Sequence, residues 1–418
     1  METRRGRLGR AFQSSGRRAR LLTVWAMTMA MLLAWLGAAP AAQAADSGFV
    51  VIQNQATSDF PKDVAFSLLA QSPDPVDLAR FVYTLADSPI TYSDIVPIAP
   101  AIRVSPSFTL DLQQRYLPPG VMIHYHWILD GQSGGTYSTP WANVMVQDAR
   151  FPWQSMTKGP LTLYWYDGDT AFASTVLSDA TKAYLRAASE VGVQTVPTGQ
   201  IYLYSTLSDF RGALAQGADQ WVGGQTFPQY HVIVLLGPSA QVTQVDRDVS
   251  HEVTHLAVDG ATTELAPLPT WLDEGMAIVS EGSVDQTYQT ALDNAAKSGA
   301  LLSVQSLSGN FPEDPNQALV AYAESGSLVR YFVQTYGQER LSQLVDAFRH
   351  GQTLDQAFEN SAGVSAQQFE QGWRASISAK PAGSDWVSVL SGPINFLSAF
   401  LRGLISDLSA GKTAAATP

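Results

Sequence analysis

The chain has 418 residues, of which 45% are hydrophobic and 10% aromatic, and this composition excludes an intrinsically disordered protein. Its formal net charge is −12, with 37 acidic against 25 basic side chains, so nucleic acid and anionic lipid are excluded as general partners, because counterion release needs clustered Lys and Arg. The chain has no cysteine, so disulfides are excluded and any metal ion must be held by histidine and carboxylate side chains.

The first 44 residues have the organisation of a signal peptide. Seven arginines precede an uncharged stretch at residues 21–39, and the small residues PAAQA follow it. We therefore expect cleavage after Ala44, which removes seven basic side chains and one acidic side chain and leaves a net charge near −18. The alternative is an uncleaved membrane anchor, since nineteen uncharged residues are about enough to span a bilayer. In either case the rest of the chain is expected outside the cytoplasm, secreted or at the cell surface.

Residues 47–150 show short alternating runs separated by Pro, Gly, Asp and Ser. DVAFSLLAQS, ARFVYTLA and VMIHYHWILDG are typical of separate strands, and the spacing of the turns predicts a β-sandwich domain that resembles immunoglobulin-like modules in pattern. His124 and His126 share one face of a predicted strand. No third histidine is placed nearby in the sequence, so we interpret them as ordinary strand residues and not as a metal pair.

Residues 155–380 have a different pattern. PLTLYWYDGD, IYLYST and HVIVLLG are typical of strands, whereas residues 170–191 and almost everything after residue 240 have apolar positions at helical spacing. A long amphipathic helix is predicted at 316–336, followed by shorter helices near 338–349, 353–360 and 365–378. The sequence therefore predicts a multidomain protein whose second domain is α+β, with a small sheet first and a helical C-terminal part.

Residues 381–418 contain an amphipathic stretch at 393–408 and a polar tail. Membrane-surface helices favour Lys and Arg on the polar face. This stretch has one Arg402 and a compensating Asp407. We therefore expect it to dock on the preceding domain, with a partner protein or a membrane as the alternatives.

The sequence SHEVTHLAVDG, residues 250–260, places two of the six histidines of the chain four residues apart. Apolar residues recur every three or four positions here, which predicts a helix on which His251 and His255 face the same way and can reach one ion. Glu252 is rotated by about 100° around that helix. Its carboxylate is therefore expected beside the ion, where it can take a proton from a metal-bound water.

A second predicted helix at 268–282 supplies a third ligand. Glu274 lies nineteen residues after His255, and a tetrahedral hydrolytic site needs three protein ligands and one open position. The alternative is a solvated helix with two surface histidines. We favour the metal site because the H-E-x-x-H pattern coincides with a glutamate in a Trp-x-x-Glu-Gly context.

HEVTH, followed after eighteen residues by the glutamate of WLDEG, resembles the gluzincin zinc metallopeptidases, of which the aminopeptidase N-like enzymes are the best known. Downstream, AYAESGSLVRYFVQTYG resembles the helical tail of the bacterial peptidase MA-like domains. The resemblance covers roughly residues 155–378. It implies a zincin-like metallopeptidase domain, one Zn²⁺ ion held by His251, His255 and Glu274, Glu252 as general base and acid, and a peptide or protein substrate.

The exopeptidase sequence GAMEN of the aminopeptidases is missing from the chain. VGGQTFP, residues 222–228, stands in the corresponding region and has no carboxylate to hold a free substrate amine, which counts against aminopeptidase activity. The rival interpretation is a binding or surface-attachment protein that keeps the metallopeptidase fold without turnover. We favour catalysis because the three ligands and the base are all present.

Related enzymes use a tyrosine or histidine to stabilise the oxyanion. Tyr322 is our first candidate and Tyr331 the alternative, although each is equally typical of a core aromatic on an amphipathic helix. Asp259 is placed to orient a histidine ligand as a hydrogen-bond acceptor. We interpret it instead as the residue that ends the helix before Gly260.

Overall fold

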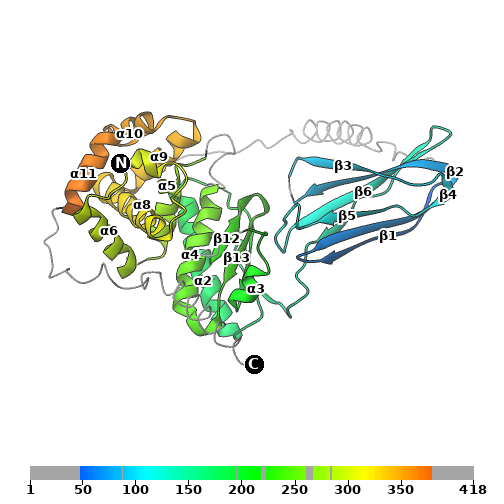
Figure 1. The fold of residues 1–418 in the computed structure, drawn as a ribbon, viewed down its shortest axis with the longest axis horizontal. Helices are drawn as coiled ribbons and strands as arrows, with labels where there is room; N and C mark the ends of the chain where they lie inside the picture. The colour runs from blue at the N-terminus through cyan, green and yellow to red at the C-terminus, as the bar shows by residue number, and fades with distance from the viewer. Residues whose placement is uncertain are drawn as a thin grey trace, which may run out of the picture.

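A computed structural model describes residues 48–86, 88–193, 195–217, 223–259, 267–282 and 285–378 (Figure 1). The predicted signal peptide and the predicted segment at 381–418 lie outside these residues. From the N-terminal side, the described chain forms an antiparallel sheet, a mixed sheet with two long helices, and a group of helices. Within these ranges, no helix combines the length and the apolar character needed to cross a membrane.

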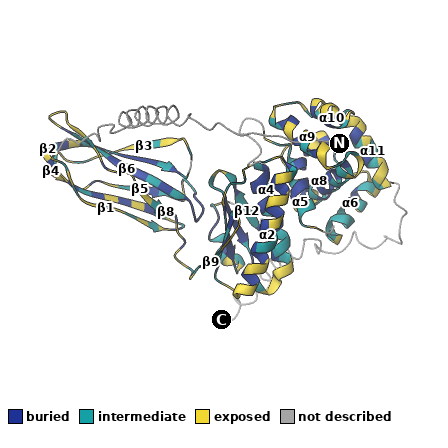
Figure 2. Ribbon diagram, turned by 180° about the vertical axis from the view of Figure 1, so that it is seen from behind, coloured by how far each residue is buried: buried dark blue, intermediate teal, exposed yellow. Residues whose placement is uncertain are grey.

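The N-terminal region is an eight-stranded sheet in which every pairing is antiparallel. The strands alternate between buried and more exposed side chains, most regularly in β6 (Figure 2), as expected when one face of a sheet packs on a core. The strands are β1 (Val50–Asp59), β2 (Asp63–Leu85), β3 (Thr91–Val96), β4 (Ala101–Val104), β5 (Ser107–Asp111), β6 (Met122–Gly131), β7 (Thr136–Ser138) and β8 (Ala142–Met145).

The 23-residue strand β2 organises this sheet. Its first half pairs with β1 on one side and with β5 and β4 on the other, and its second half pairs with β3 and β6. The sequence predicted two separate strands here, and that prediction is wrong. Pro73 and Pro75 do not end the strand, because the pairing changes register between Gln71 and Val76, and a proline is tolerated at such an irregularity.

The second sheet has the order β12-β13-β11-β10-β9. Its three central strands are parallel, and both edge strands are antiparallel to their neighbours. The helices α2 (Thr170–Glu190) and α4 (Val242–Asp259) pack through buried aliphatic side chains against this sheet. The strands are β9 (Gln154–Lys158), β10 (Leu161–Trp165), β11 (Gly199–Tyr204), β12 (Gly224–Phe227) and β13 (Val232–Leu236), and the short α3 (Leu207–Arg211) follows β11.

The C-terminal part is helical, and the predicted long helix is confirmed as α8. Glycines bring α5 and α8 together, because a Cβ at Gly275 would lie 2.5 Å from the carbonyl oxygen of Ser325, and one at Gly326 would lie 2.5 Å from Cγ2 of Ile278. The position of α5 on α8 is therefore closely fixed. The helices are α5 (Thr270–Ser280), α6 (Gln286–Ser298), α7 (Val304–Leu307), α8 (Pro315–Tyr336), α9 (Gln338–Arg349), α10 (Leu354–Ala362) and α11 (Ala366–Ser378).

One hydrophobic core joins the N-terminal sheet to the second sheet. It includes Trp127 of β6 and Tyr204 of β11 in the same cluster. At its edge Asp148 is buried, forms an ion pair of 2.6 Å with Arg150, and accepts a hydrogen bond of 2.8 Å from the hydroxyl of Tyr204. The segment between the two sheets is thus packed and hydrogen-bonded.

Candidate metal centre

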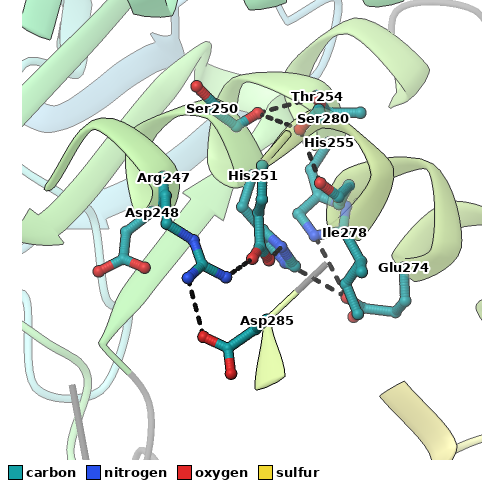
Figure 3. A network of polar contacts seen from close by, with 12 residues as sticks. Arg247, Asp248, Ser250, His251, Thr254, His255, Glu274, Ile278, Ser280 and Asp285 are labelled. Carbon is teal, nitrogen blue, oxygen red and sulfur yellow. Dashed lines mark hydrogen bonds and ion pairs between the residues drawn. The ribbon is translucent and has the colours of Figure 1, made fainter. Parts of the chain in front are cut away.

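The helix α4 has an apolar face and a polar face. The apolar face is buried and packs toward the second sheet, and it consists of Val245, Val249, Val253 and Leu256. This burial agrees with the helical periodicity predicted from the sequence. The rows of residues beside this apolar stripe point the other way, toward α5 (Figure 3). The HEVTH sequence lies on these rows. Burial of the apolar face against the sheet therefore directs the polar face of the helix toward α5.

His251 and His255 of α4 meet Glu274 of α5 (Figure 3). Nε2 of His251 lies 3.4 Å from Oε2 of Glu274, and Nε2 of His255 lies 3.5 Å from the same oxygen. The three side chains each offer a ligand atom within 4.8 Å of the others. Glycine-mediated packing of α5 on α8 fixes the helix that carries Glu274, so the fold brings the three predicted ligands together.

These distances fit a zinc ion. With bonds of about 2.0–2.1 Å in a tetrahedral arrangement, two ligand atoms lie about 3.3 Å apart. In addition, no group among the described residues donates a hydrogen bond to the buried Oε2 of Glu274. A buried carboxylate oxygen in that position is costly unless a cation or a donor satisfies it.

Two further carboxylates fix the imidazole rings. Nδ1 of His251 lies 2.9 Å from Oε1 of Glu281, and Nδ1 of His255 lies 3.0 Å from Oδ1 of Asp273. A carboxylate acceptor at Nδ1 sets the tautomer and turns Nε2 toward the ligand site. The sequence did not single out either carboxylate. Asp259 ends α4, as expected, and the acceptor for His255 is Asp273 instead.

The electrostatics of the site favour positive charge. Burial opposes protonation of His251, but the nearby carboxylates of Glu274 and Glu281 outweigh burial and raise its pKa to about 10. Burial likewise opposes ionisation of Glu274, but the two nearby histidines hold its pKa below the usual range. A site that stabilises protonated imidazoles this strongly will also stabilise a divalent cation, which then competes with protons for the same nitrogens.

Glu252 is held by a strand of the sheet. The hydroxyl of Thr226 on β12 donates a hydrogen bond of 2.6 Å to Oε2 of Glu252. On the same strand, a Cβ at Gly224 would lie 2.5 Å from Oε1 of Glu252. Gly224 and Thr226 belong to the sequence VGGQTFP, so this segment does lie beside the site. The described part of it, residues 223–228, has no carboxylate.

The candidate tyrosines lie on α8 in different surroundings. The ring of Tyr331 packs 5.6 Å from that of Phe369, and its hydroxyl points at Gly372 on α11, so it is a helix-packing residue. Tyr322 packs edge-on against Phe311 at 5.1 Å. Tyr322 also lies close enough to Tyr288 to affect it electrostatically: the pKa of Tyr288 is raised by burial first and then by its interactions with Glu281, Tyr322 and Glu274. The sequence did not single out Tyr288.

The histidine pair of the N-terminal sheet has different partners. Nδ1 of His124 lies 2.7 Å from the side-chain oxygen of Asn143, and the ring of His126 packs at a tilt against that of Trp141, with 4.2 Å between the ring centroids. Across the described ranges, the group of three or more potential ligands that lies close enough to hold a metal is His251, His255 and Glu274. This arrangement agrees with the interpretation of His124 and His126 as strand residues.

Comparison with known families agrees with the ligand geometry. Residues 179–379 match the model of the Peptidase MA superfamily. The chain carries a Peptidase MA-like domain. The matched residues include the whole of α4 and α5, and thus every ligand candidate of the metal centre. The resemblance inferred from HEVTH and WLDEG is thereby confirmed.

Solved structures resemble the chain at low identity. An M1 zinc metallopeptidase from Deinococcus radiodurans is 13% identical, with 74% of this chain and 89% of that chain covered and a TM-score of 0.35. An aminopeptidase N family protein from Idiomarina loihiensis is 10% identical, with 75% and 68% covered and a TM-score of 0.33. BhCBM56 is 9% identical over 22% of this chain and 88% of its own, with a TM-score of 0.18. No curated protein matches the chain. The Peptidase MA-like domain therefore has to be interpreted from its own residues.

Proposed function

We propose that this protein is an exported, zinc-dependent metallopeptidase that hydrolyses peptide bonds. One observation carries the proposal: Oε2 of Glu274 lies 3.4 and 3.5 Å from the Nε2 atoms of His251 and His255, while both Nδ1 atoms are held by carboxylates. His251, His255 and Glu274 would hold the ion. When bound, zinc polarises a scissile carbonyl and lowers the pKa of a coordinated water.

Glu252 is the general base in this proposal. Its Oε2 accepts the hydroxyl of Thr226, which leaves Oε1 as the atom that takes the proton from the attacking water and passes it to the leaving nitrogen. A carboxylate fixed by a hydrogen bond from a sheet strand loses little freedom in this step, and such pre-organisation contributes to the rate. Tyr322 is retained as the proposed hydroxyl donor to the oxyanion, because it interacts electrostatically with Tyr288, which is itself close to Glu281 and Glu274 of the site.

The substrate is proposed to be a peptide or protein that needs no free amine at the site. The described strand β12, which borders Glu252, carries no carboxylate, and an aminopeptidase needs one to hold the substrate amine. Export is supported by the arginine-rich start, the uncharged stretch and the small residues before Ala45. The zincin-like character of the second region and the immunoglobulin-like character of the first also belong to this proposal, supported by the strand and helix patterns.

Metal content and turnover of the purified protein test the proposal. We expect one zinc ion per chain and hydrolysis of a denatured protein or a peptide library. Glu252→Gln should keep the zinc, because the ligands are intact, and lose at least ~100-fold in turnover, the usual scale for a removed general base. Zinc bound without any turnover would favour the non-catalytic alternative, and undiminished activity of Glu252→Gln would refute the mechanism.

A further inference from the structure

The guanidinium of Arg247 connects three helices near the metal centre. Arg247 lies on α4, one turn before His251 (Figure 3). Its Nη2 lies 2.7 Å from Oε2 of Glu281 at the end of α5, and its Nη1 lies 2.8 Å from Oδ2 of Asp285. Asp285 is the N-cap of α6, where its other oxygen accepts a hydrogen bond of 2.6 Å from the backbone N–H of Thr287.

Glu281 divides its two oxygens between different partners. Oε2 accepts from Arg247, while Oε1 accepts from Nδ1 of His251 at 2.9 Å. The side chain of Glu281 is only 9% exposed. A guanidinium presents its N–H groups in a rigid planar fork, so an ion pair with it fixes the orientation of a carboxylate as well as its charge.

Removal of the guanidinium would leave Glu281 in an acidic environment. Glu281 lies close enough to the carboxyl of Asp248 to help raise its pKa to about 7, after burial as the first cause. With Asp285 and Glu274 also nearby, a Glu281 without its guanidinium partner would be repelled by its neighbours and would rotate away. The imidazole of His251 would then lose its fixed acceptor.

We propose that Arg247 is a positioning residue of the metal centre: by orienting Glu281, it holds the ring of His251 with Nε2 directed at Glu274. This inference rests on the proposed zinc site. Arg247 does not touch the ligand atoms, so its effect has to pass through Glu281. The competing interpretation is a purely structural one, in which Arg247 joins α4 to the start of α6 through Asp285.

Zinc affinity, measured by competition with a chromophoric chelator at neutral pH, separates the two interpretations without any activity assay. Arg247→Met should bind zinc about 10- to 100-fold more weakly, the scale reported for a partner of a metal-ligating histidine. Arg247→Lys should lose less, because an ammonium can pair with Glu281 but cannot bridge both carboxylates. If Arg247→Met does not fold, the zinc affinity of Arg247→Lys is compared with that of the wild-type protein instead.

Asp285→Asn is the matched control. Asparagine also caps helices, and Glu281 keeps its guanidinium partner in this variant, so zinc affinity should stay within about 3-fold.

A double-mutant cycle tests whether Arg247 acts on the zinc site through Glu281. Glu281→Ala should weaken zinc binding by itself, and adding Arg247→Met to it should weaken binding no further. Equal losses from Arg247→Met with and without Glu281 would support the structural interpretation and overturn the inference. Unchanged zinc affinity in Arg247→Met would also overturn it, while leaving the zinc site in place. Absence of zinc from the unmutated protein would refute the proposed function and the inference together.

Discussion

Thr226 donates its hydroxyl to Oε2 of Glu252 over 2.6 Å, so an edge strand of the second sheet holds a carboxylate that projects from a helix. Thr226 and Glu252 are 26 residues apart in the sequence. The carboxylate is thus fixed by the sheet, and it does not depend on the ligands for its position. This separation allows the base and the metal to be tested independently.

The first prediction concerns that hydrogen bond. Thr226→Val keeps the shape of the side chain but removes the donor, and we expect kcat/KM to fall about 10- to 100-fold, since a hydrogen bond to a charged group contributes roughly 1.5–3 kcal/mol. Thr226→Ser retains the hydroxyl and should keep most of the activity. Zinc content should be the same in both variants. Full activity of Thr226→Val, measured with one equivalent of zinc, would show that the bond has no role.

The second prediction concerns the space beside Oε1 of Glu252. A Cβ at Gly224 would lie 2.5 Å from that oxygen and 2.7 Å from Cδ1 of Leu235, so Gly224→Ala must displace the carboxylate. We expect more than ~10-fold lower turnover with zinc retained, because misplacing a catalytic group is costly. Gly309→Ala is the control, since nothing lies within 4 Å of a Cβ built there. Equal activities of the two variants would contradict this prediction.

The third prediction concerns the ligands. His255→Ala removes one of three groups that converge on a single position, and we expect loss of stoichiometric zinc at neutral pH by elemental analysis. His124→Ala should retain a full equivalent, because His124 lies beside Asn143 in the N-terminal sheet. One tightly held zinc ion in His255→Ala would mean that the ligand assignment is wrong.

The fourth prediction concerns pH and a buried carboxyl in the helical part. Glu324 is fully buried, and its two oxygens each accept from the backbone N–H of Leu302 at 3.1 Å. Burial raises its pKa from 4.5 to about 7. The folded state therefore binds the proton more tightly than the unfolded state, and stability that is present below about pH 4.5 is lost as the pH rises to 7. The loss amounts to roughly 3 kcal/mol at most.

Melting temperatures of the wild-type protein and of Glu324→Gln between pH 5 and pH 8 check this sign. The glutamine variant is neutral throughout, so its stability relative to the wild type should increase with pH. A difference between the two proteins that stays constant over that range would show that Glu324 does not change its protonation.

The ligands could be predicted because their pattern is local. Two histidines one helical turn apart must share a face, and the apolar stripe of α4 determines which side of the helix is buried. Glu281 and Arg247 could not be recognised in the same way. Glu281 lies 30 residues from His251, and their contact depends on the angle between two packed helices, which periodicity does not encode.

The strand residues could be predicted from the sequence, but the continuity of the strands could not. Alternation predicted the strand residues of β2 and β6, but it could not show that two predicted strands are one, because prolines ordinarily end strands and their tolerance at an irregularity depends on the neighbouring strands. The hydrogen bond from β12 to Glu252 could not be predicted from the sequence either. A threonine and a glycine in an edge strand carry no distinctive signal until the helix beside them is placed.

The hydrophobic core shared by the two sheets extends beyond the residues that match the family model. The family match begins at residue 179, within α2, and leaves out β10, which pairs with the matched strand β11. A fragment cut at that boundary would lose the edge of its sheet and expose apolar side chains such as Val232 and Val234, which lie in the shared cluster. The Peptidase MA-like domain is therefore not expected to fold by itself, because the N-terminal sheet covers part of the core that surrounds its own sheet.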